Sequence, residues 1–390
     1  MIKITKEQAR HLALQHQFHR FSNLKGKAGT LEVIRTLSYI QLDTISVIQR
    51  AHHHTLYNRI DDYHPEMLDA LLAKDKAIWE YWGHAASYLP REDYPYYRNR
   101  MLTFPNNQWE RNLWKAHSDI SKHVLNRIRK EGPLSSKHFE HTGKKQANNG
   151  WGNVKPSKIM LELLMWRGDL IVTARDNWQR VYDLTERVIP HYKEMEIPAE
   201  MARAEFMIIR TLQAHGIATE SDINKHITLA PRKAVSESLN RLVKADKVRK
   251  LHIEEQKDIW YCFADLDLSG IHQDADGRNV RILSPFDNAV ILRSRLTHIF
   301  DFDYSLECYV TPAKRQFGYW NCPILFNDIL VGILDPKADR KSKTLNLNTI
   351  FIRKDIWKQK RFQTAFDKEL QRFIQFNGCT TYSLGKVVQK

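Results

Sequence analysis

The pattern of the chain changes within Ser38-Tyr39-Ile40-Gln41-Leu42-Asp43-Thr44-Ile45-Ser46-Val47. A helical pattern at 31–37 leads into it, and from Gln41 the residues alternate instead. From Gln41 onward the β-branched residues favour a strand, in which side chains two residues apart share one face. The pattern therefore predicts that the Gln41 amide and the Asp43 carboxylate stand side by side, with apolar side chains on the opposite face. It also fits the solvent face of an ordinary half-buried strand, so these residues alone leave both interpretations open.

The composition indicates a globular protein of several modules with a polyanionic partner. The chain has 390 residues, 42% of them hydrophobic and 11% aromatic, and its 60 Lys and Arg exceed its 45 Asp and Glu by 15. Such a positive surplus makes nucleic acid the simplest partner. No apolar run approaches the roughly 20 residues that span a bilayer, so no membrane segment is expected. The four cysteines lack metal-ligand spacing and, with no secretory signal visible, are expected to be reduced thiols of a cytoplasmic protein.

Helical patterns followed by short strands recur three times, which predicts repetition of one small module. The order of helix, helix and strand is typical of a winged helix, in which a small β-wing follows a helix-turn-helix. In the first module we expect a helix capped by Thr5, a Gly/Lys loop at 25–29, and a helix from Leu31 to Ile40 with Thr30 as its N-cap. In the second, Pro156 opens a helix that is followed by a hairpin over 168–184. The predicted domains are residues 1–115, 116–190 and 200–265, followed by a β-rich domain over 280–390.

The C-terminal domain is predicted to be a small β-barrel or sandwich, because short strand patterns follow one another closely. A final basic helix is expected over 356–376, with fraying residues after it. The fold class is therefore α+β, with tandem winged-helix modules before the barrel or sandwich. The strand candidates lie at 305–310, 317–322, 324–326, 329–334 and 345–352.

Several further residues are candidates for contacts with nucleic acid. Trp82 and His84 lie in an aromatic segment that predicts either a buried, hydrogen-bonded histidine or a cleft that stacks on bases. Lys144 and Lys145 lie in a basic segment that predicts either a phosphate contact or a solvated face. The run at 52–54 consists of three histidines without carboxylate or cysteine partners at site spacing. We interpret it as a solvated or phosphate-facing turn, and we expect neither a metal site nor a cofactor.

Four motifs together resemble the bacterial winged-helix DNA glycosylases of the YcaQ/AlkZ type, and the similarity runs over nearly the whole chain. The catalytic signature of that family is Gln, an apolar residue, and Asp or Gln, which matches Gln41-Leu42-Asp43. The other motifs are Tyr81-Trp82-Gly83-His84-Ala85, Leu283-Ser284-Pro285-Phe286-Asp287, and the run from Phe300 to Tyr309 with Pro312-Ala313-Lys314-Arg315-Gln316-Phe317-Gly318-Tyr319.

This resemblance implies a concave, basic DNA-binding surface and a glycosylase that excises bulky or cationic N7-alkylguanines and unhooks interstrand crosslinks. No lysine belongs to the Gln41-Leu42-Asp43 motif, so we expect no Schiff-base lyase step and a monofunctional enzyme. The chemistry is reasonable because N7-alkylation leaves the purine positively charged and hence a good leaving group. The enzyme must then stabilise an oxocarbenium-like sugar and direct water at C1′. Asp43 would act as electrostatic stabiliser and general base, and Gln41 would hold the water. Because a crosslinked guanine cannot swing into a deep pocket, we expect an open cleft at Asp43.

The same reading makes Lys314 and Arg315 candidates for phosphate contacts, although they would serve equally well as caps of the β-rich domain. The expected partner is double-stranded DNA carrying alkylated or crosslinked guanine, bound by a monomer that is cytoplasmic and nucleoid-associated on DNA. The main alternative is a non-catalytic winged-helix transcription regulator. That class predicts a dimerisation segment, and no coiled-coil heptad is visible in the sequence. An RNA-processing protein is a third class, for which no RRM or KH signature is visible.

Overall fold

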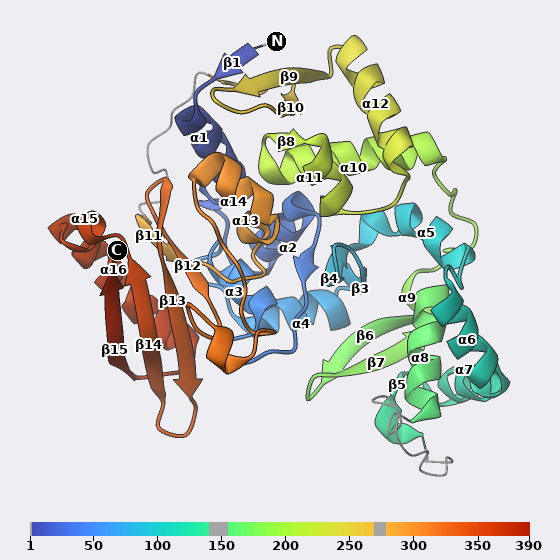
Figure 1. Ribbon diagram of the computed structural model, residues 1–390. Coiled ribbons are helices and arrows are strands. Elements are labelled where there is room, and N and C mark those ends of the chain that lie inside the picture. Colours follow the sequence, from blue (N-terminus) through green and yellow to red (C-terminus); the bar gives the residue numbers. More distant parts are fainter. Residues whose placement is uncertain (1, 140–154, 269–277) are drawn as a thin grey trace.

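The computed structural model describes residues 2–139, 155–268 and 278–390 (Figure 1). The described chain mixes helices with four separate open sheets, which confirms the α+β class. Figure 1 shows one helix-and-hairpin unit in the middle, a second at the lower right, a third at the top, and a larger sheet at the left. No helix in the described ranges is long and apolar enough to cross a membrane.

Three parts of the chain share one order of elements: a helix, a two-residue strand, one or two helices, and a hairpin. In each unit the short strand pairs with the second strand of the hairpin, so the three sheets have the same strand order. Unit one consists of α2 (Gly26–Leu37), β2 (Ile40–Gln41), α3 (Ala51–Tyr57), α4 (Pro65–Ala73), β3 (Ile78–Trp82) and β4 (Ala86–Pro90). Unit two consists of α7 (Ser121–Glu131), β5 (Leu134–Ser135), α8 (Pro156–Arg167), β6 (Leu170–Asp176) and β7 (Gln179–Leu184). Unit three consists of α10 (Glu200–His215), β8 (Ala218–Thr219), α11 (Glu220–His226), α12 (Arg232–Lys244), β9 (Val248–Ile253) and β10 (Ile259–Phe263).

The N-terminus is built into unit three rather than into unit one. Strand β1 (Ile2–Ile4) pairs in parallel with β9, as a fourth strand of that sheet. Helix α1 (Lys6–Gln17) follows, with the predicted capping box between Thr5 and Gln8. The helices between and after the units are α5 (Tyr94–Leu102), α6 (Gln108–His117), α9 (Thr185–Val188), α13 (Asn288–Ile291) and α14 (Arg293–Phe300).

The strand predicted from Gln41 to Ile48 is wrong beyond its first residue. Strand β2 ends at Gln41, and the chain then runs as a loop to α3. The turn comes from Asp43, whose Oδ1 accepts a hydrogen bond from the Ile45 backbone N–H at 2.7 Å. In units two and three, Ser135 and Thr219 end the short strand and cap the following helical turn directly. Unit one therefore differs from its two repeats by carrying a loop at this point.

Two further predictions for unit one are also wrong. Helix α2 begins at Gly26 and includes the segment predicted as a Gly/Lys loop, so Thr30 lies inside the helix and donates to the Gly26 carbonyl. The histidines at 52–54 lie in α3 rather than in a turn, and His52 and His54 are buried. Burial lowers the pKa of His54 to about 4, although the imidazole lies 2.8 Å from the Ile282 carbonyl, and the ring is therefore neutral at physiological pH.

The C-terminal part is one open five-stranded sheet, so the barrel or sandwich prediction is wrong. Its strands, in sheet order, are β11 (Val280–Ile282), β12 (Cys322–Phe326), β13 (Ile329–Asp339), β14 (Thr344–Ile352) and β15 (Thr381–Gln389). Strand β15 pairs in parallel with β14, where fraying residues were predicted. Helices α15 (Lys354–Trp357) and α16 (Lys360–Phe376) precede it, and α16 packs phenylalanines into the core that this sheet shares with unit one. The predicted strand at 305–310 is a loop, and so is most of that at 317–322.

Candidate active site

Asp43 lines a pocket of about 390 Å³ between its own loop and the hairpin of unit two. The side chain is half-buried. Burial raises the pKa of this carboxyl, and the hydrogen bond from the Ile45 N–H partly opposes that rise. A carboxylate with a raised pKa is a better proton acceptor than an ordinary aspartate. The pocket is partly open to solvent.

Gln41 is held by the sheet of unit one, directly before the Asp43 loop. It pairs with Ser87 on β4, and the next residue, Leu42, donates its N–H to the Ala86 carbonyl at 2.8 Å. Leu42 is buried in the core, which fixes the backbone between the two polar residues. Within the described residues the Gln41 Oε1 is buried without a hydrogen-bond partner. Gln41 itself is not among the residues that line the pocket, whereas Leu42 and Asp43 are.

Trp178, at the tip of the β6–β7 hairpin, forms the opposite wall of the pocket. The guanidinium groups of Arg50 and Arg175 each lie 4.1 Å from the centre of its ring, and the His52 ring stacks on it at 5.1 Å. Trp178 and its neighbour Asn177 both have positive φ values, as a tight two-residue hairpin turn requires. The hairpin of unit two therefore packs against α3 of unit one, and this contact sets the position of the pocket between them.

A buried carboxylate holds the same two units together behind the pocket. Glu80 on β3 is 1% exposed and accepts hydrogen bonds from Arg175, at 2.6 Å, and from Arg180. Arg180 also donates to Glu162 on α8 at 3.1 Å. Arg175 and Arg180 both line the pocket, and carboxylates of the protein neutralise both of these charges. Lys158 is the lysine among the residues that line the pocket.

Two residues of a loop in the C-terminal part, Cys308 and Tyr309, feel the charge of Asp43. The Asp43 carboxylate is near enough to Cys308 and Tyr309 to raise the pKa of both side chains, after the larger effect of burial. Tyr309 is 76% exposed, whereas Cys308 is buried. Sequence reasoning missed Trp178, Arg175 and Tyr309 as site residues. Only Tyr309 left a signal, because it lies in a run that carried the family resemblance.

The predicted DNA-binding residues do not all lie together. Trp82 is 43% exposed at the tip of the β3–β4 hairpin. It pairs with Ala86, whose carbonyl also accepts the hydrogen bond from the Leu42 N–H. His84 is half-buried, stacks on Tyr39, and has its Nδ1 2.7 Å from the Lys225 carbonyl. Lys314 is exposed, while Arg315 donates to the Val310 carbonyl and covers the Tyr319 ring. Lys144 and Lys145 lie outside the described residues.

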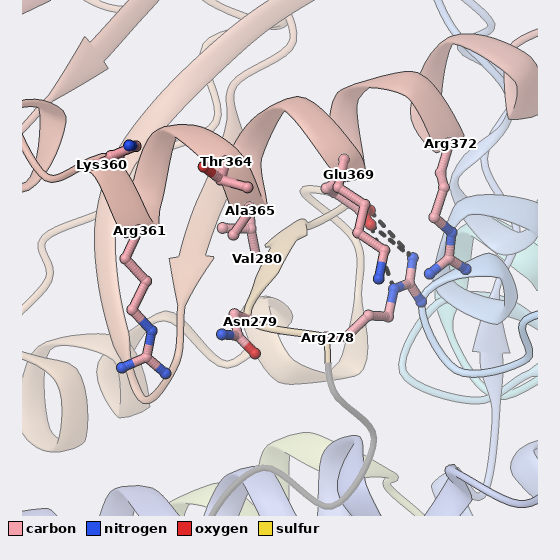
Figure 2. Close-up of a pocket in the computed structure, with 10 residues that line it drawn as sticks. Arg278, Asn279, Val280, Lys360, Arg361, Thr364, Ala365, Glu369 and Arg372 are labelled. Atoms are coloured by element: carbon pink, nitrogen blue, oxygen red, sulfur yellow. Dashed lines mark hydrogen bonds and ion pairs between the residues drawn. The ribbon is translucent and has the colours of Figure 1, made fainter.

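A larger groove of about 550 Å³ runs along α16 and is rimmed by cations (Figure 2). Its carboxylate, Glu369, is buried and bonded to Arg278, as the dashed lines in Figure 2 show. Lys360, Arg361 and Lys368 line the groove and are exposed. The groove offers positive charge but no free carboxylate, so it suits binding of an anion rather than the chemistry expected of Asp43.

Comparisons with known proteins identify the family of the chain. A model of the AlkZ-like DNA glycosylase family matches residues 34–376, which include Gln41, Asp43 and Tyr309. Among solved structures, DNA glycosylase AlkZ from Streptomyces sahachiroi is similar over 99% of this chain and 100% of that chain, with a TM-score of 0.65 and 15% identity. At that identity the structural likeness shows the shared fold, and the family match covers well over half of the chain. The chain therefore belongs to the AlkZ-like DNA glycosylase family.

Proposed function

We propose that this DNA glycosylase hydrolyses the N-glycosidic bond of N7-alkylguanine and unhooks interstrand crosslinks formed through that atom. The observation that carries the proposal is a half-buried carboxylate with a raised pKa, Asp43, at the edge of a partly open pocket. Of the cations that line this pocket, two are paired with Glu80. A positively charged purine can therefore approach Asp43 without meeting two free guanidinium charges.

The reaction needs no metal or cofactor in this proposal. The C1′–N9 bond breaks and the alkylguanine leaves as a neutral base, because its positive charge takes up the bonding electron pair. The ionised Asp43 stabilises the positive sugar and takes a proton from the attacking water, whose oxygen bonds to C1′. The free Oε1 of Gln41 accepts the other hydrogen of that water. The product is an abasic site.

The three helix-and-hairpin units are proposed to be winged-helix modules. Their common strand order and their helices before the hairpin support this assignment. The proposed domains are residues 1–115, 116–190, 200–265 and 280–390, with strand β1 of the first domain adding to the sheet of the third. We propose that they form a concave DNA-binding surface with the C-terminal sheet, on which Trp82, His84, Lys314 and Arg315 contact DNA. The basic groove on α16 would contact flanking phosphates. The enzyme would act as a cytoplasmic, nucleoid-associated monomer.

Base release and crosslink unhooking can be measured separately. The purified chain is incubated with a duplex carrying one 7-methylguanine, and with a duplex joined by one guanine N7–N7 crosslink. We expect free 7-methylguanine from the first duplex and separable single strands from the second. Binding to a preferred sequence without release of base would favour the transcription-regulator alternative instead.

The monofunctional mechanism has its own test, because Lys158 lines the same pocket as Asp43. An amine that attacked C1′ would form a Schiff base, which borohydride reduces to a covalent protein–DNA adduct. We expect base release without a borohydride-trapped adduct and without strand cleavage before alkali treatment. A trapped adduct that disappears in Lys158→Ala would show a lyase step and overturn the monofunctional assignment.

A further inference from the structure

One buried carboxylate is shared by two arginines of the pocket. Arg175 and Arg180 are direct partners across the β6–β7 hairpin, and both line the pocket at Asp43. Like charges in directly opposed strand positions repel, so this pairing is unfavourable by itself. Glu80, on β3 of unit one, accepts from Arg175 with its Oε2 at 2.6 Å and from the Arg180 Nε with its Oε1. Because Glu80 is 1% exposed, solvent screens these contacts little.

The charges around the pocket balance only when Glu80 is counted with them. Among the described residues that line the pocket, three are cations and two are carboxylates: Lys158, Arg175, Arg180, Asp43 and Glu162. Glu162 accepts from Arg180 at 3.1 Å. Glu80 does not line the pocket itself, but its contacts with the two guanidinium groups supply the third negative charge. Without Glu80, the pocket would hold one positive charge in excess.

The strand position of Glu80 connects this charge to the candidate catalytic motif. In the sheet of unit one, Glu80 is opposite Tyr88, and Tyr88 is opposite Ile40 in the strand that leads into the motif. On the other side, Arg175 donates to the Trp178 carbonyl at 2.9 Å and lies over the ring of that residue, which forms the pocket wall. A continuous chain of contacts therefore joins the motif strand to the opposite wall, and it passes through the Glu80 carboxylate.

The balance of charge matters most for a substrate that is itself positive. N7-alkylguanine in DNA carries a positive charge, whereas undamaged guanine is neutral. An uncompensated guanidinium charge in the pocket would repel the alkylated base and would leave a neutral base unaffected. A carboxylate that cancels this charge therefore favours the charged base over a neutral base of the same shape.

We propose that Glu80 gives the pocket its preference for a positively charged base, because it cancels guanidinium charge while it holds Arg175 and Arg180 in place. Glu80 is thus a positioning residue, which acts through the two arginines and does not touch the base. This inference rests on the proposed function, since it assumes that alkylguanine enters this pocket. A role in folding alone would affect charged and neutral bases equally, and the two roles can therefore be separated.

Binding of a charged base and of its neutral isostere measures this preference. One duplex carries 7-methylguanine and the other carries 7-methyl-7-deazaguanine, which has the same shape without the charge. A 2′-fluoro sugar prevents base release from both. We expect the wild type to bind the charged duplex more tightly than the neutral one. Glu80→Gln is expected to lower this affinity ratio roughly 10-fold, as one unit charge about 10 Å away would at an effective dielectric constant of about 20.

Three further variants separate the effect of charge from an effect on folding. Glu80→Gln/Arg175→Gln removes one charge of each sign, so its affinity ratio is expected to return toward that of the wild type. Glu162→Gln makes the same change in pocket charge at a half-buried position, and it is expected to lower the ratio even if Glu80→Gln does not fold. Asp93→Asn is the matched control, because Asp93 is a buried carboxylate bonded to Arg210 and does not line the pocket.

The outcomes separate this proposal from the proposed function. If Glu80→Gln leaves the ratio unchanged, even while it weakens binding to both duplexes, its role is structural and the proposal is refuted. An equal fall in Asp93→Asn, no fall in Glu162→Gln, or a wild type that binds both duplexes equally also refutes it. The proposed function fails separately, if the wild type releases no base from an unfluorinated 7-methylguanine duplex.

Discussion

At the scale of single residues, Asp43 combines partial burial with access from a pocket. It is buried enough for its pKa to be raised, yet it lines a pocket that substrate can enter. Its hydrogen bond from the Ile45 N–H orients one oxygen and leaves the other for chemistry. The loop that makes this possible is absent from units two and three, where a capping side chain starts the next helical turn directly.

The pH dependence of base release follows from this raised pKa. An Asp43 that works as an anion loses activity when it is protonated, so the rate falls as the pH drops through its pKa. We expect the midpoint of that fall above the roughly 3.9 of an unperturbed aspartate. Single-turnover release of 7-methylguanine between pH 4 and pH 8, corrected for spontaneous loss, measures it. A wild-type rate that stays constant down to pH 4 would contradict the ionised role.

The motif from Leu283 to Asp287 has a structural role that its sequence did not reveal. Arg59 and Asp287 form a fully buried, bidentate ion pair at 2.7–2.8 Å, and Arg59 also bonds Gln17. The pair ties α1 and the segment after α3 to the start of α13. Burial of two charges is tolerated here because each is paired and hydrogen-bonded.

Removing one member of this pair is expected to be strongly destabilising. Arg59→Met leaves the Asp287 carboxylate buried without its partner, which lowers the free energy of unfolding by about 3–5 kcal/mol. Denaturant unfolding at neutral pH measures this loss. The double variant Arg59→Met/Asp287→Leu removes both charges and is expected to recover part of it. No recovery in the double variant would show that the packing of Arg59, and not the charge left behind, causes the loss.

At the scale of elements, the loop between α14 and β12 is a rigid structure built from side-chain caps. Gly318 has a φ of +128°, and a Cβ at this position would collide with the Asp335 carboxyl group. Asp335 in turn accepts the backbone N–H groups of Tyr319 and Trp320 at 2.8–3.0 Å. Only glycine therefore allows the loop to close as observed.

Gly318→Ala is expected to displace this loop and with it Tyr309. The strain is about 1–3 kcal/mol, and we expect at least a severalfold fall in the rate of base release at saturating enzyme. Gly378→Ala is the matched control, because Gly378 also has a positive φ but nothing lies within 4 Å of the added Cβ. Equal rates of release for the two variants would show that the loop geometry does not matter to the reaction.

Elements with a strong local pattern were predicted well. The start of α8 at Pro156 was predicted correctly, and the hairpin of unit two was predicted to within a few residues. The loop at Asp43 was predicted as a strand, because its β-branched residues follow strand statistics while one Asp43 hydrogen bond turns the chain. Strand β15 was missed because its parallel partner, β14, is separated from it by α15 and α16. The pocket wall formed by Trp178 was missed for the same kind of reason, since Trp178 comes from a segment distant from Asp43 in the sequence.

At the scale of the whole molecule, positive charge is spread over several parts of a chain with a formal net charge of +15. The three units repeat one strand order, and the family match covers residues 34–376. The resemblance seen in the sequence is thereby confirmed as family membership, and the DNA substrate with it. The small β-barrel or sandwich predicted from short strands is instead an open sheet backed by α16.

The basic groove on α16 predicts how salt affects DNA binding. Each phosphate contact contributes about 0.9 to the slope of log affinity against log salt concentration. Replacing Lys360, Arg361 and Lys368 by alanine is expected to reduce the slope by about 2–3 and to weaken binding irrespective of sequence. The control replaces three exposed lysines outside the groove, Lys354, Lys358 and Lys386. If both triple variants show the same slope, net charge alone accounts for binding and the groove has no special role.

The central claim is that the Asp43 carboxylate drives hydrolysis of the alkylguanine bond. Its most direct test is the single-turnover rate of 7-methylguanine release by the wild type and by Asp43→Asn, which keeps the side-chain oxygen that accepts from Ile45. The account predicts a rate about 10²–10⁴-fold lower for Asp43→Asn with unchanged DNA binding. Asp69→Asn, which removes another carboxyl with a raised pKa, is expected to retain the wild-type rate. Equal rates for the wild type and Asp43→Asn would contradict the claim.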